Sequence, residues 1–428
     1  MTADGHQELK VATSVGIVHL ARQVLFDPQR GGHFLPANAV LPPHAGMVIT
    51  RRLQEWACLL AGEVGFTVAQ RLLGWRTGEP AVLGTSEVQR LVCRHGQVLR
   101  EAAIREIAAL EARPSLAGLT ARLQPNEPPR CPAAWPRELA AVVDRALAAR
   151  DPQAPAGVSR ADWERVLETQ RAAAGAVDRA TLARLGPAIA AGQVVAAADE
   201  VQVRTPQKGV FTPLQTARVA TTAGYRYLCG EESWFFRQLF LLIQLAGAPA
   251  GWVTFLADGG RRLRRFFTEQ LQGLPRAEFV LDWYHLVKKV RDRISRMGGS
   301  KAAKQELRQA VVGALWQGQV EAALTHLEQY RPTARNPVAL DELQTYLQAR
   351  DGLGGLPNYR DWRQQRRYIG SGWAEKANDL LVARRQKRRG MHWSLPTSEA
   401  LALLKCLQLN HEWDAYWVEG RLPSLVAA

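Results

Sequence analysis

Three acidic residues lie in sequence contexts that could support metal-dependent chemistry. Asp199 follows a run of small and apolar residues, Asp258 ends a second apolar run before two glycines, and Glu375 follows a Gly-Ser-Gly segment. Charged side chains are costly inside a strand unless they are paired or bound to a metal ion. Three carboxylates suit Mg²⁺, which takes a few such ligands together with water and phosphate oxygens. The chemistry that such a set supports is two-metal, in-line attack on a phosphodiester.

Each of these residues also has a purely structural interpretation. Asp199 could start a turn at a strand end, and Asp258 with Gly259 is an ordinary turn sequence. Glu375 lies four residues before Asp379, beside arginines, and could belong to a surface ion pair. We favour the catalytic interpretation because the order of the surrounding elements brings all three residues together.

Those elements predict a mixed α/β domain that begins at residue 193. Helices are expected at 234–247 and 261–272 from their apolar periodicity. Five strands are expected, at 193–205, 216–224, 225–230, 250–258 and 277–285. Three strands, helix, strand, helix, strand is similar to the order in ribonuclease H-like domains, whose sheets gather carboxylates at strand ends and on an adjacent helix.

The rest of the chain is predicted to be mainly helical. Residues 1–45 lack periodicity and resemble an arm, and 46–112 have helical spacing compatible with either a helix-turn-helix DNA-binding domain or a plain bundle. A Pro-rich linker with helices is expected at 113–192. The α/β domain would run over 193–290 and 369–428, interrupted by a helical insertion at 291–368.

Composition favours a globular protein with a polyanionic partner. The 428 residues are 47% hydrophobic and 22% charged, which excludes a disordered or collagen-like chain. Fifty-five Lys and Arg against forty Asp and Glu give a net charge of +15, which favours nucleic acid. The five cysteines are scattered, and the N-terminus lacks signal-peptide features, so we expect a cytoplasmic protein. The apolar stretch 239–257 is broken by Gln and Gly and predicts no membrane span.

Basic residues cluster after residue 287 and between residues 359 and 393. Arginine and lysine would contact phosphates and fix the register on DNA. For the aromatic residues among them, Trp362, Tyr368, Trp373 and Trp393, we favour inward packing over stacking on bases. The candidates for DNA binding are Lys288, Lys289, Arg366, Arg367, Arg384, Arg385, Lys387, Arg388 and Arg389.

Four stretches together carry a family resemblance that covers about 195–414. They are ADGGRRLRRFF, FVLDWYHLVKKV, YIGSGWAEKAND and RRQKRRGMHWS. In this order they resemble the catalytic half of bacterial insertion-sequence transposases of the DDE class, of the ISKra and Lre types, which are relatives of the Mutator transposases. The resemblance implies an α/β ribonuclease H-like catalytic domain with a mixed five-stranded sheet, interrupted by an all-α insertion and preceded by an all-α N-terminal domain.

The resemblance also implies a site and a reaction. Asp199, Asp258 and Glu375 would be the catalytic residues and metal ligands, with Asp282 and His285 as auxiliary residues. Mg²⁺, or Mn²⁺ in its place, would support cleavage at the terminal inverted repeats and strand transfer. The partners implied are double-stranded DNA, both element ends and target, and further copies of the chain in a homodimer or higher oligomer.

Two departures from the family pattern leave alternatives open. Glu200 stands where the family commonly has Gly, and Gly260 is followed by Arg261 and Arg262 in place of an aromatic residue. A domesticated or inactive DNA-binding descendant is one alternative. A structure-selective nuclease or an RNA-processing enzyme on the same fold is another, and a basic scaffold without chemistry is the least favoured.

Overall fold

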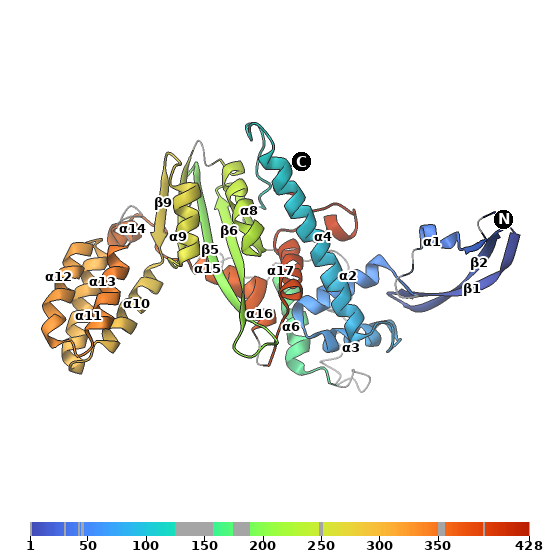
Figure 1. Cartoon of the computed structure of the whole chain (residues 1–428), viewed down its shortest axis with the longest axis horizontal. Coiled ribbons are helices and arrows are strands. Elements are labelled where there is room, and N and C mark those ends of the chain that lie inside the picture. The colour runs from blue at the N-terminus through green and yellow to red at the C-terminus, as the bar shows by residue number, and fades with distance from the viewer. Residues whose placement is uncertain are drawn as a thin grey trace.

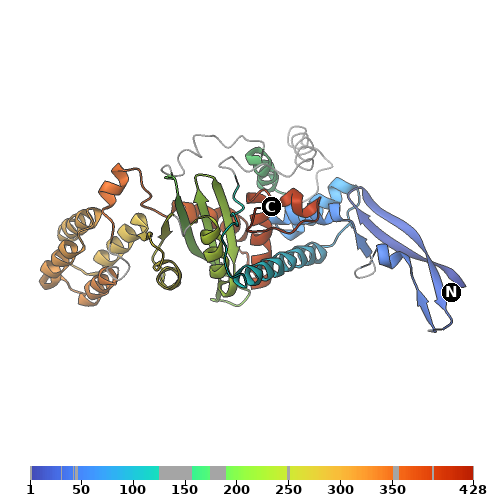
Figure 2. The same cartoon turned by 90° about the horizontal axis from the view of Figure 1, so that it is seen from above.

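The computed structural model forms an elongated molecule with three parts. A small sheet at the N-terminal end, a central α/β domain and a helical bundle follow one another along its length (Figures 1 and 2). The structure describes residues 2–29, 31–41, 43, 47–124, 157–173, 189–247, 251–349, 356–387 and 390–427. Most of the Pro-rich region at 113–192 lies outside the described residues, including 138–149, where its sequence predicts a short helix.

A five-stranded mixed sheet forms the core of the central domain. Its strand order is β7-β6-β5-β8-β9, in which β5, β6 and β7 are antiparallel neighbours and β8 and β9 run parallel to β5. The strands and the helices between them follow the predicted order. They are β5 (Gln193–Arg204), β6 (Phe211–Thr221), β7 (Gly224–Gly230), α8 (Glu232–Leu245), β8 (Trp252–Ala257), α9 (Arg261–Phe266), a π-helical turn (Phe267–Leu271) and β9 (Ala277–Leu281).

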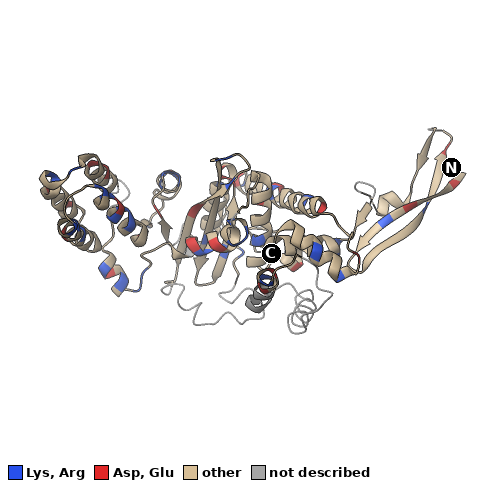
Figure 3. Ribbon diagram, turned by 90° about the horizontal axis from the view of Figure 1, so that it is seen from below, with Lys and Arg blue, Asp and Glu red and all other residues tan. Residues whose placement is uncertain are grey.

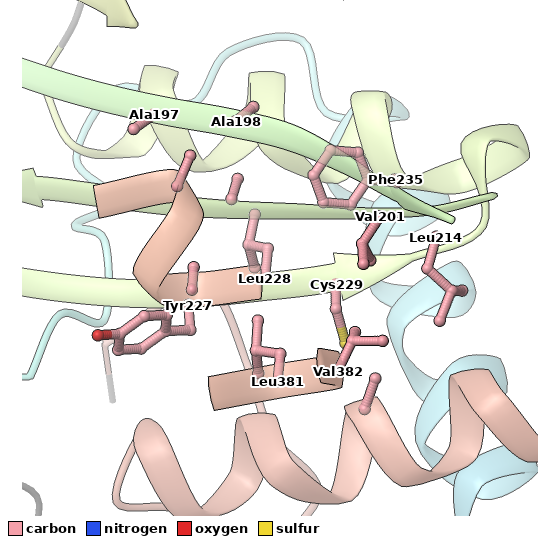
Figure 4. Close-up of a cluster of buried hydrophobic side chains, with 14 of the residues drawn as sticks. Ala197, Ala198, Val201, Leu214, Tyr227, Leu228, Cys229, Phe235, Leu381 and Val382 are labelled. Carbon is pink, nitrogen blue, oxygen red and sulfur yellow. The ribbon is translucent and has the colours of Figure 1, made fainter. Parts of the chain in front are cut away.

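Helices cover the sheet on both faces, which explains the nearly continuous apolar runs of its strands. Figure 4 shows α8 above the strands and a second helical layer below them, in which Val382 lies beside Cys229. The second layer consists of α15 (Gly372–Asn378), its π-helical continuation (Asp379–Ala383), α16 (Arg384–Gln386) and α17 (Leu395–Leu409). The chain then ends through α18 (Trp413–Trp417).

Strand β6 begins five residues before its predicted start at residue 216. The extra segment contains Pro213, which pairs with Gln202 of β5. Strand β7 pairs with β6 only from Gln215 onwards, so Pro213 has no strand on its other side. Proline lacks the N–H that a central strand needs, and this free edge tolerates it.

The predicted N-terminal arm is a four-stranded sheet, which corrects the expectation of an all-α N-terminal domain. Strands β1 (Thr2–Thr13), β2 (Gly16–Asp27), β3 (Gly32–Phe34) and β4 (Met47–Ile49), with α1 (Ala37–Val40), have the order β3-β2-β1-β4. Most side chains of β1 and β2 are exposed or half-buried. A strand without a buried face shows little alternation of polar and apolar residues, so its sequence gives a weak signal.

Helices form the rest of the described N-terminal region, as predicted for 46–112. They are α2 (Arg51–Glu63), α3 (Phe66–Thr77), α4 (Thr85–Glu111) and, further along, α6 (Arg160–Ala173). Helix α4 packs closely on α17 at Gly96. A Cβ atom at this position would lie only 2.1 Å from the Cβ of Ala400, so the contact requires glycine. The helix-turn-helix interpretation stays a prediction.

The segment between β9 and α15 is helical throughout its described secondary structure. It consists of α10 (Trp283–Arg296), α11 (Lys301–Trp316), α12 (Val320–Tyr330), a short 3₁₀ turn (Arg331–Thr333), α13 (Pro337–Gln348) and α14 (Tyr359–Gln364). Within the part of the chain that the structure describes, no helix combines the length and hydropathy needed to cross a membrane.

Candidate active site

Asp199 and Asp258 lie at the same level of two neighbouring parallel strands. The register of β5 and β8 pairs Ala197 with Leu256, and continuing it by two residues along each chain places Asp199 beside Asp258. Adjacent strands are about 4.8 Å apart, so the two carboxylates belong to one site. Asp258 lies directly after β8, where its Oδ1 accepts a hydrogen bond of 2.7 Å from the N–H of Gly260.

Glu375 approaches these residues from the helical layer. It lies in the first turn of α15, which packs against β5 and β6. Its side chain is 58% exposed, and its Oε1 is 3.7 Å from Nε2 of His285, in the first turn of α10. The three acidic residues predicted from the sequence therefore come from the middle of β5, the end of β8 and one covering helix.

The electrostatics of Asp199 depend on both of the other acidic residues. Burial is the main reason that the pKa of Asp199 rises to about 6, and the negative charges of Asp258 and Glu375 raise it further. The N–H of Glu200 at 2.7 Å and the charge of His285 act in the opposite direction. Asp199 is thus a carboxylate whose ionised form lacks sufficient compensation within the chain.

Asp282 is a buried link between α10 and the segment that precedes Glu375. Its Oδ2 accepts a 2.7 Å hydrogen bond from the hydroxyl of Ser371 and a second bond from the N–H of the same residue. Its Oδ1 caps α10 through the N–H of His285 at 2.8 Å and lies 3.3 Å from Nδ1 of that ring. Burial would raise the pKa of Asp282, but these interactions outweigh it and lower the pKa to about 2. In turn, Asp282 raises the pKa of His285.

Asn378 and Ser371 are site residues that the sequence analysis did not identify. Asn378 donates from Nδ2 to Oδ2 of Asp199 and accepts at Oδ1 from the hydroxyl of Thr216, which faces Asp199 across β5 and β6. It lies three residues after Glu375, so one helical turn of α15 carries both residues. Its position within YIGSGWAEKAND was an available signal, but its partner is 179 residues away.

Glu200 and Arg262, two residues that differ from the pattern that the sequence resembles, interact with each other. Arg262 pairs with Glu200 through Nη1 and lies 2.6 Å from Glu232 through Nε. Glu200 also accepts a 3.0 Å hydrogen bond from Gln215. Glu200, the residue after Asp199, and Arg262 thus connect β5 to α9 beside the site.

The carboxylates of Asp199, Asp258 and Glu375 are chemically suited to Mg²⁺, although they do not converge on one point in this structure. Within the described residues, no three His, Cys, Asp or Glu side chains are close enough together to hold a metal ion as they stand. Carboxylates are nevertheless the ligands that Mg²⁺ prefers. Burial first, and the charges of Asp258 and Glu375 after it, raise the pKa of Asp199, and a bound cation would offset both effects.

The predicted DNA-binding residues fall into four groups, of which the buried one contains Arg385 alone. Lys288, Arg366, Arg384 and Lys387 are exposed, Lys289 and Arg367 are half-buried, and Arg388 and Arg389 lie outside the described residues. Basic residues occur in all three parts of the molecule (Figure 3).

Arg385 has to be removed from the DNA-binding set. It is 4% exposed, donates to the carbonyl of Ala61 at 2.6 Å, and lies over the ring of Trp393 at 4.8 Å. A guanidinium held in this way inside the protein joins α16 to α2 and does not reach a phosphate.

The aromatic residues follow the favoured inward packing where their side chains are described. Tyr368 and Trp393 are each 7% exposed. Trp362 is half-buried and lies under the guanidinium of Arg367, 3.5 Å from the ring centre. The side chain of Trp373 lies outside the described part.

Comparison with known proteins gives no family assignment. No protein-family model matches the chain, and no curated protein matches it.

Proposed function

We propose that the protein is a DNA transposase of the DDE type, which cleaves the ends of its own insertion sequence and joins them to target DNA. The observation that carries the proposal is the proximity of Asp199 on β5 to Asp258, directly after the parallel strand β8, with Glu375 on the covering helix. The strand order β7-β6-β5-β8-β9, with β6 antiparallel to both of its neighbours, supports a ribonuclease H-like domain.

In this proposal the three acidic residues would hold Mg²⁺, and Mn²⁺ would substitute for it. When bound, the metal would supply activation of the attacking oxygen and neutralisation of charge on the leaving oxygen. Asn378 fixes the orientation of the Asp199 carboxylate, while Asp282 holds the segment that begins the Glu375 helix. His285 supports the negative charge of Glu375 from a distance of 3.7 Å.

Double-stranded DNA is the proposed partner, at both the element ends and the target. The net charge of +15 and the exposed residues Lys288, Arg366, Arg384 and Lys387 support phosphate binding. Because strand transfer must hold two ends together, we expect a homodimer or a larger assembly on DNA.

The test is a cleavage and strand-transfer assay on duplexes that carry the inverted repeats flanking the gene. With Mg²⁺ or Mn²⁺, the wild-type protein should nick at the repeat end. Asp258→Asn and Glu375→Gln should each reduce the rate by at least about 1,000-fold, because catalytic groups acting as one unit are lost together. Both variants should still bind the duplex.

Asp292→Asn is the matched control, because Asp292 is an exposed residue on α10 whose replacement makes the same chemical change away from the carboxylates. Cleavage that survives both site substitutions would refute this active site. Tight binding of the repeats without wild-type cleavage would instead support a domesticated or inactive descendant. Cleavage of branched substrates without preference for the repeats would support a structure-selective nuclease.

A further inference from the structure

Tyr284 is an unusually exposed aromatic residue beside the candidate active site. Its exposed fraction is 66%, compared with 49% for Phe34 and 50% for Phe211. Single exposed apolar residues are common on protein surfaces and need no special explanation. The position of Tyr284 is what distinguishes it, because it lies between Asp282 and His285 in the first turn of α10.

The Tyr284 ring is supported on one side by the backbone that precedes Glu375. A Cβ atom at Gly370 would lie 3.2 Å from both Cδ2 and Cε2 of the ring, so a larger residue at position 370 would push against the ring. The same segment is fixed by the bonds from Ser371 to Asp282. The ring is therefore seated against the backbone beside the site while most of its surface remains open.

The neighbouring aromatic residue points the other way. Trp283 packs against Trp316 and Tyr359, with ring centres 4.7 and 4.8 Å apart. Packing of this kind explains a structural aromatic residue, but it does not account for Tyr284. One turn further along α10, the exposed Lys288 shares the face of Tyr284 and provides a positive charge for a phosphate.

We propose that Tyr284 is a stacking platform for an unpaired base next to the phosphodiester that the carboxylates attack. The inference rests on the proposed function and specifies its substrate as a DNA end with at least one unstacked base. Aromatic rings bind bases of any sequence in this way, because every base has a flat π-face. The site would thus favour frayed or single-stranded ends over fully paired DNA.

The experiment compares two DNA ends in the absence of divalent metal. One duplex carries the flanking repeat with a three-nucleotide single-stranded end, in which the first unpaired base is 2-aminopurine, and the other is blunt. Wild-type protein should bind the single-stranded end more tightly and quench the 2-aminopurine fluorescence by stacking. Tyr284→Leu should weaken binding of that end by about five- to 100-fold and abolish the quenching, while its affinity for the blunt duplex stays unchanged.

Further variants separate stacking from general effects. Tyr284→Phe and Tyr284→Trp keep a ring and should retain both the preference and the quenching. Phe211→Ala is the matched control, because Phe211 is an exposed aromatic residue on β6, five residues before Thr216, which pairs with Asp199. The same loss in Phe211→Ala, or an unchanged preference in Tyr284→Leu, would overturn the proposal.

The outcome is distinguishable from a failure of the proposed function. If the cleavage assay fails but binding of single-stranded ends depends on the Tyr284 ring, the base-binding site stands without the transposase. If cleavage depends on Asp258 and Glu375 while Tyr284→Leu binds as the wild type does, the transposase stands and the stacking site is refuted.

Discussion

Two polar regions of the central domain differ in whether a positively charged side chain compensates their buried carboxylate. Beside the edge strand β7, the buried Glu412 accepts hydrogen bonds of 3.0 and 3.1 Å from Arg226. Asn410 covers the same edge by accepting from the N–H of Tyr227 at 2.8 Å and donating to its carbonyl at 2.9 Å. At the candidate active site, by contrast, Asp199 is buried beside other carboxylates and its pKa rises to about 6.

In the first region the charge of the buried carboxylate is compensated by the protein's own residues, and we call this region complete. In the second region it is not. Glu412 meets the positive charge of Arg226 inside the protein, so nothing further is needed to stabilise it. Asp199 is buried near the negative charges of Asp258 and Glu375, and both effects disfavour its ionised form unless a cation or substrate compensates them. Strongly perturbed groups of the second kind are typical of functional sites. The comparison therefore supports a structural role for the first region and a chemical role for the second.

The largest expected effect on stability comes from breaking the buried ion pair between Arg226 and Glu412. Arg226→Met should lower the free energy of unfolding by about 3–5 kcal/mol, because among the described residues it leaves the buried Glu412 with the more distant Arg122, 3.7 Å away, for compensation. Chemical denaturation followed by circular dichroism measures the loss. The matched substitution at the site, Asp258→Asn, should leave the free energy of unfolding unchanged or raise it. Equal destabilisation by both changes would remove the contrast between the regions.

A second prediction concerns His95, a buried residue whose two ring nitrogens both have hydrogen-bond partners. Unlike Arg226, it can change its protonation state between about pH 3 and pH 7. Its Nδ1 lies 2.6 Å from the hydroxyl of Tyr416, and its Nε2 lies 2.9 Å from Oε1 of Gln54. Burial lowers the pKa of His95 to about 3, and the charges of Arg94 and Arg51 contribute. Below about pH 6.5 the unfolded chain binds a proton that the folded chain does not, so stability is lost as the pH falls toward 3.

The expected loss for His95 is about 2 kcal/mol between pH 7 and pH 5. His95→Gln should be less stable than the wild type at pH 8, since it loses bonds to buried partners, but its stability should depend less on pH. Urea unfolding at several pH values measures both effects. A wild-type and a variant profile of equal slope would show that His95 is not held neutral.

The contrast between the two regions also shows what the sequence can reveal. Runs such as VVAAAD and WVTFLAD predict buried strands because both faces of the sheet are covered, and their terminal aspartates stand out for the same reason. The elements of the central domain and three acidic residues of one site could therefore be predicted. The partnerships that complete each region could not, because they join distant residues: Arg226 is 186 residues from Glu412, and Asn378 is 179 residues from Asp199.

The N-terminal sheet and Arg385 illustrate two further limits. The N-terminal sheet was not predicted, because β1 and β2 are exposed over most of their length. Without a buried face, their sequences do not alternate between polar and apolar residues. The second belongs to a basic run, where composition predicts exposure, yet its guanidinium is buried against Trp393. Charge identifies a basic segment but not which of its members face the solvent.

Asp282 provides a third prediction, of intermediate size. Its pKa of about 2 lies below the usual value of 3.8, so its ionised form stabilises the fold by about 2 kcal/mol above pH 4, and this contribution is lost as the pH falls toward 2. Asp282→Asn should therefore lower the free energy of unfolding by about 2 kcal/mol at pH 7 and reduce the loss of stability in acid. Ser371→Ala, which removes one of its donors, should cost less. A neutral effect of Asp282→Asn would mean that the link to Ser371 does not hold the Glu375 helix.

The smallest effect is expected for the ion pair that joins the two departures from the family pattern. Glu200 and Arg262 are partly exposed, with side chains 26% and 45% accessible, so the pair should contribute less than about 1 kcal/mol to the free energy of unfolding. A double-mutant cycle with Glu200→Gln and Arg262→Gln isolates that coupling. The same four proteins also sharpen the comparison, because the pair lies beside Asp199 and Asp258. If it tunes the charge of the site, cleavage should change in the single variants and partly recover in the double variant while stability hardly moves. If the two substitutions are coupled in the free energy of unfolding but not in the cleavage rate, Glu200 and Arg262 have a structural role, like Arg226 and Glu412.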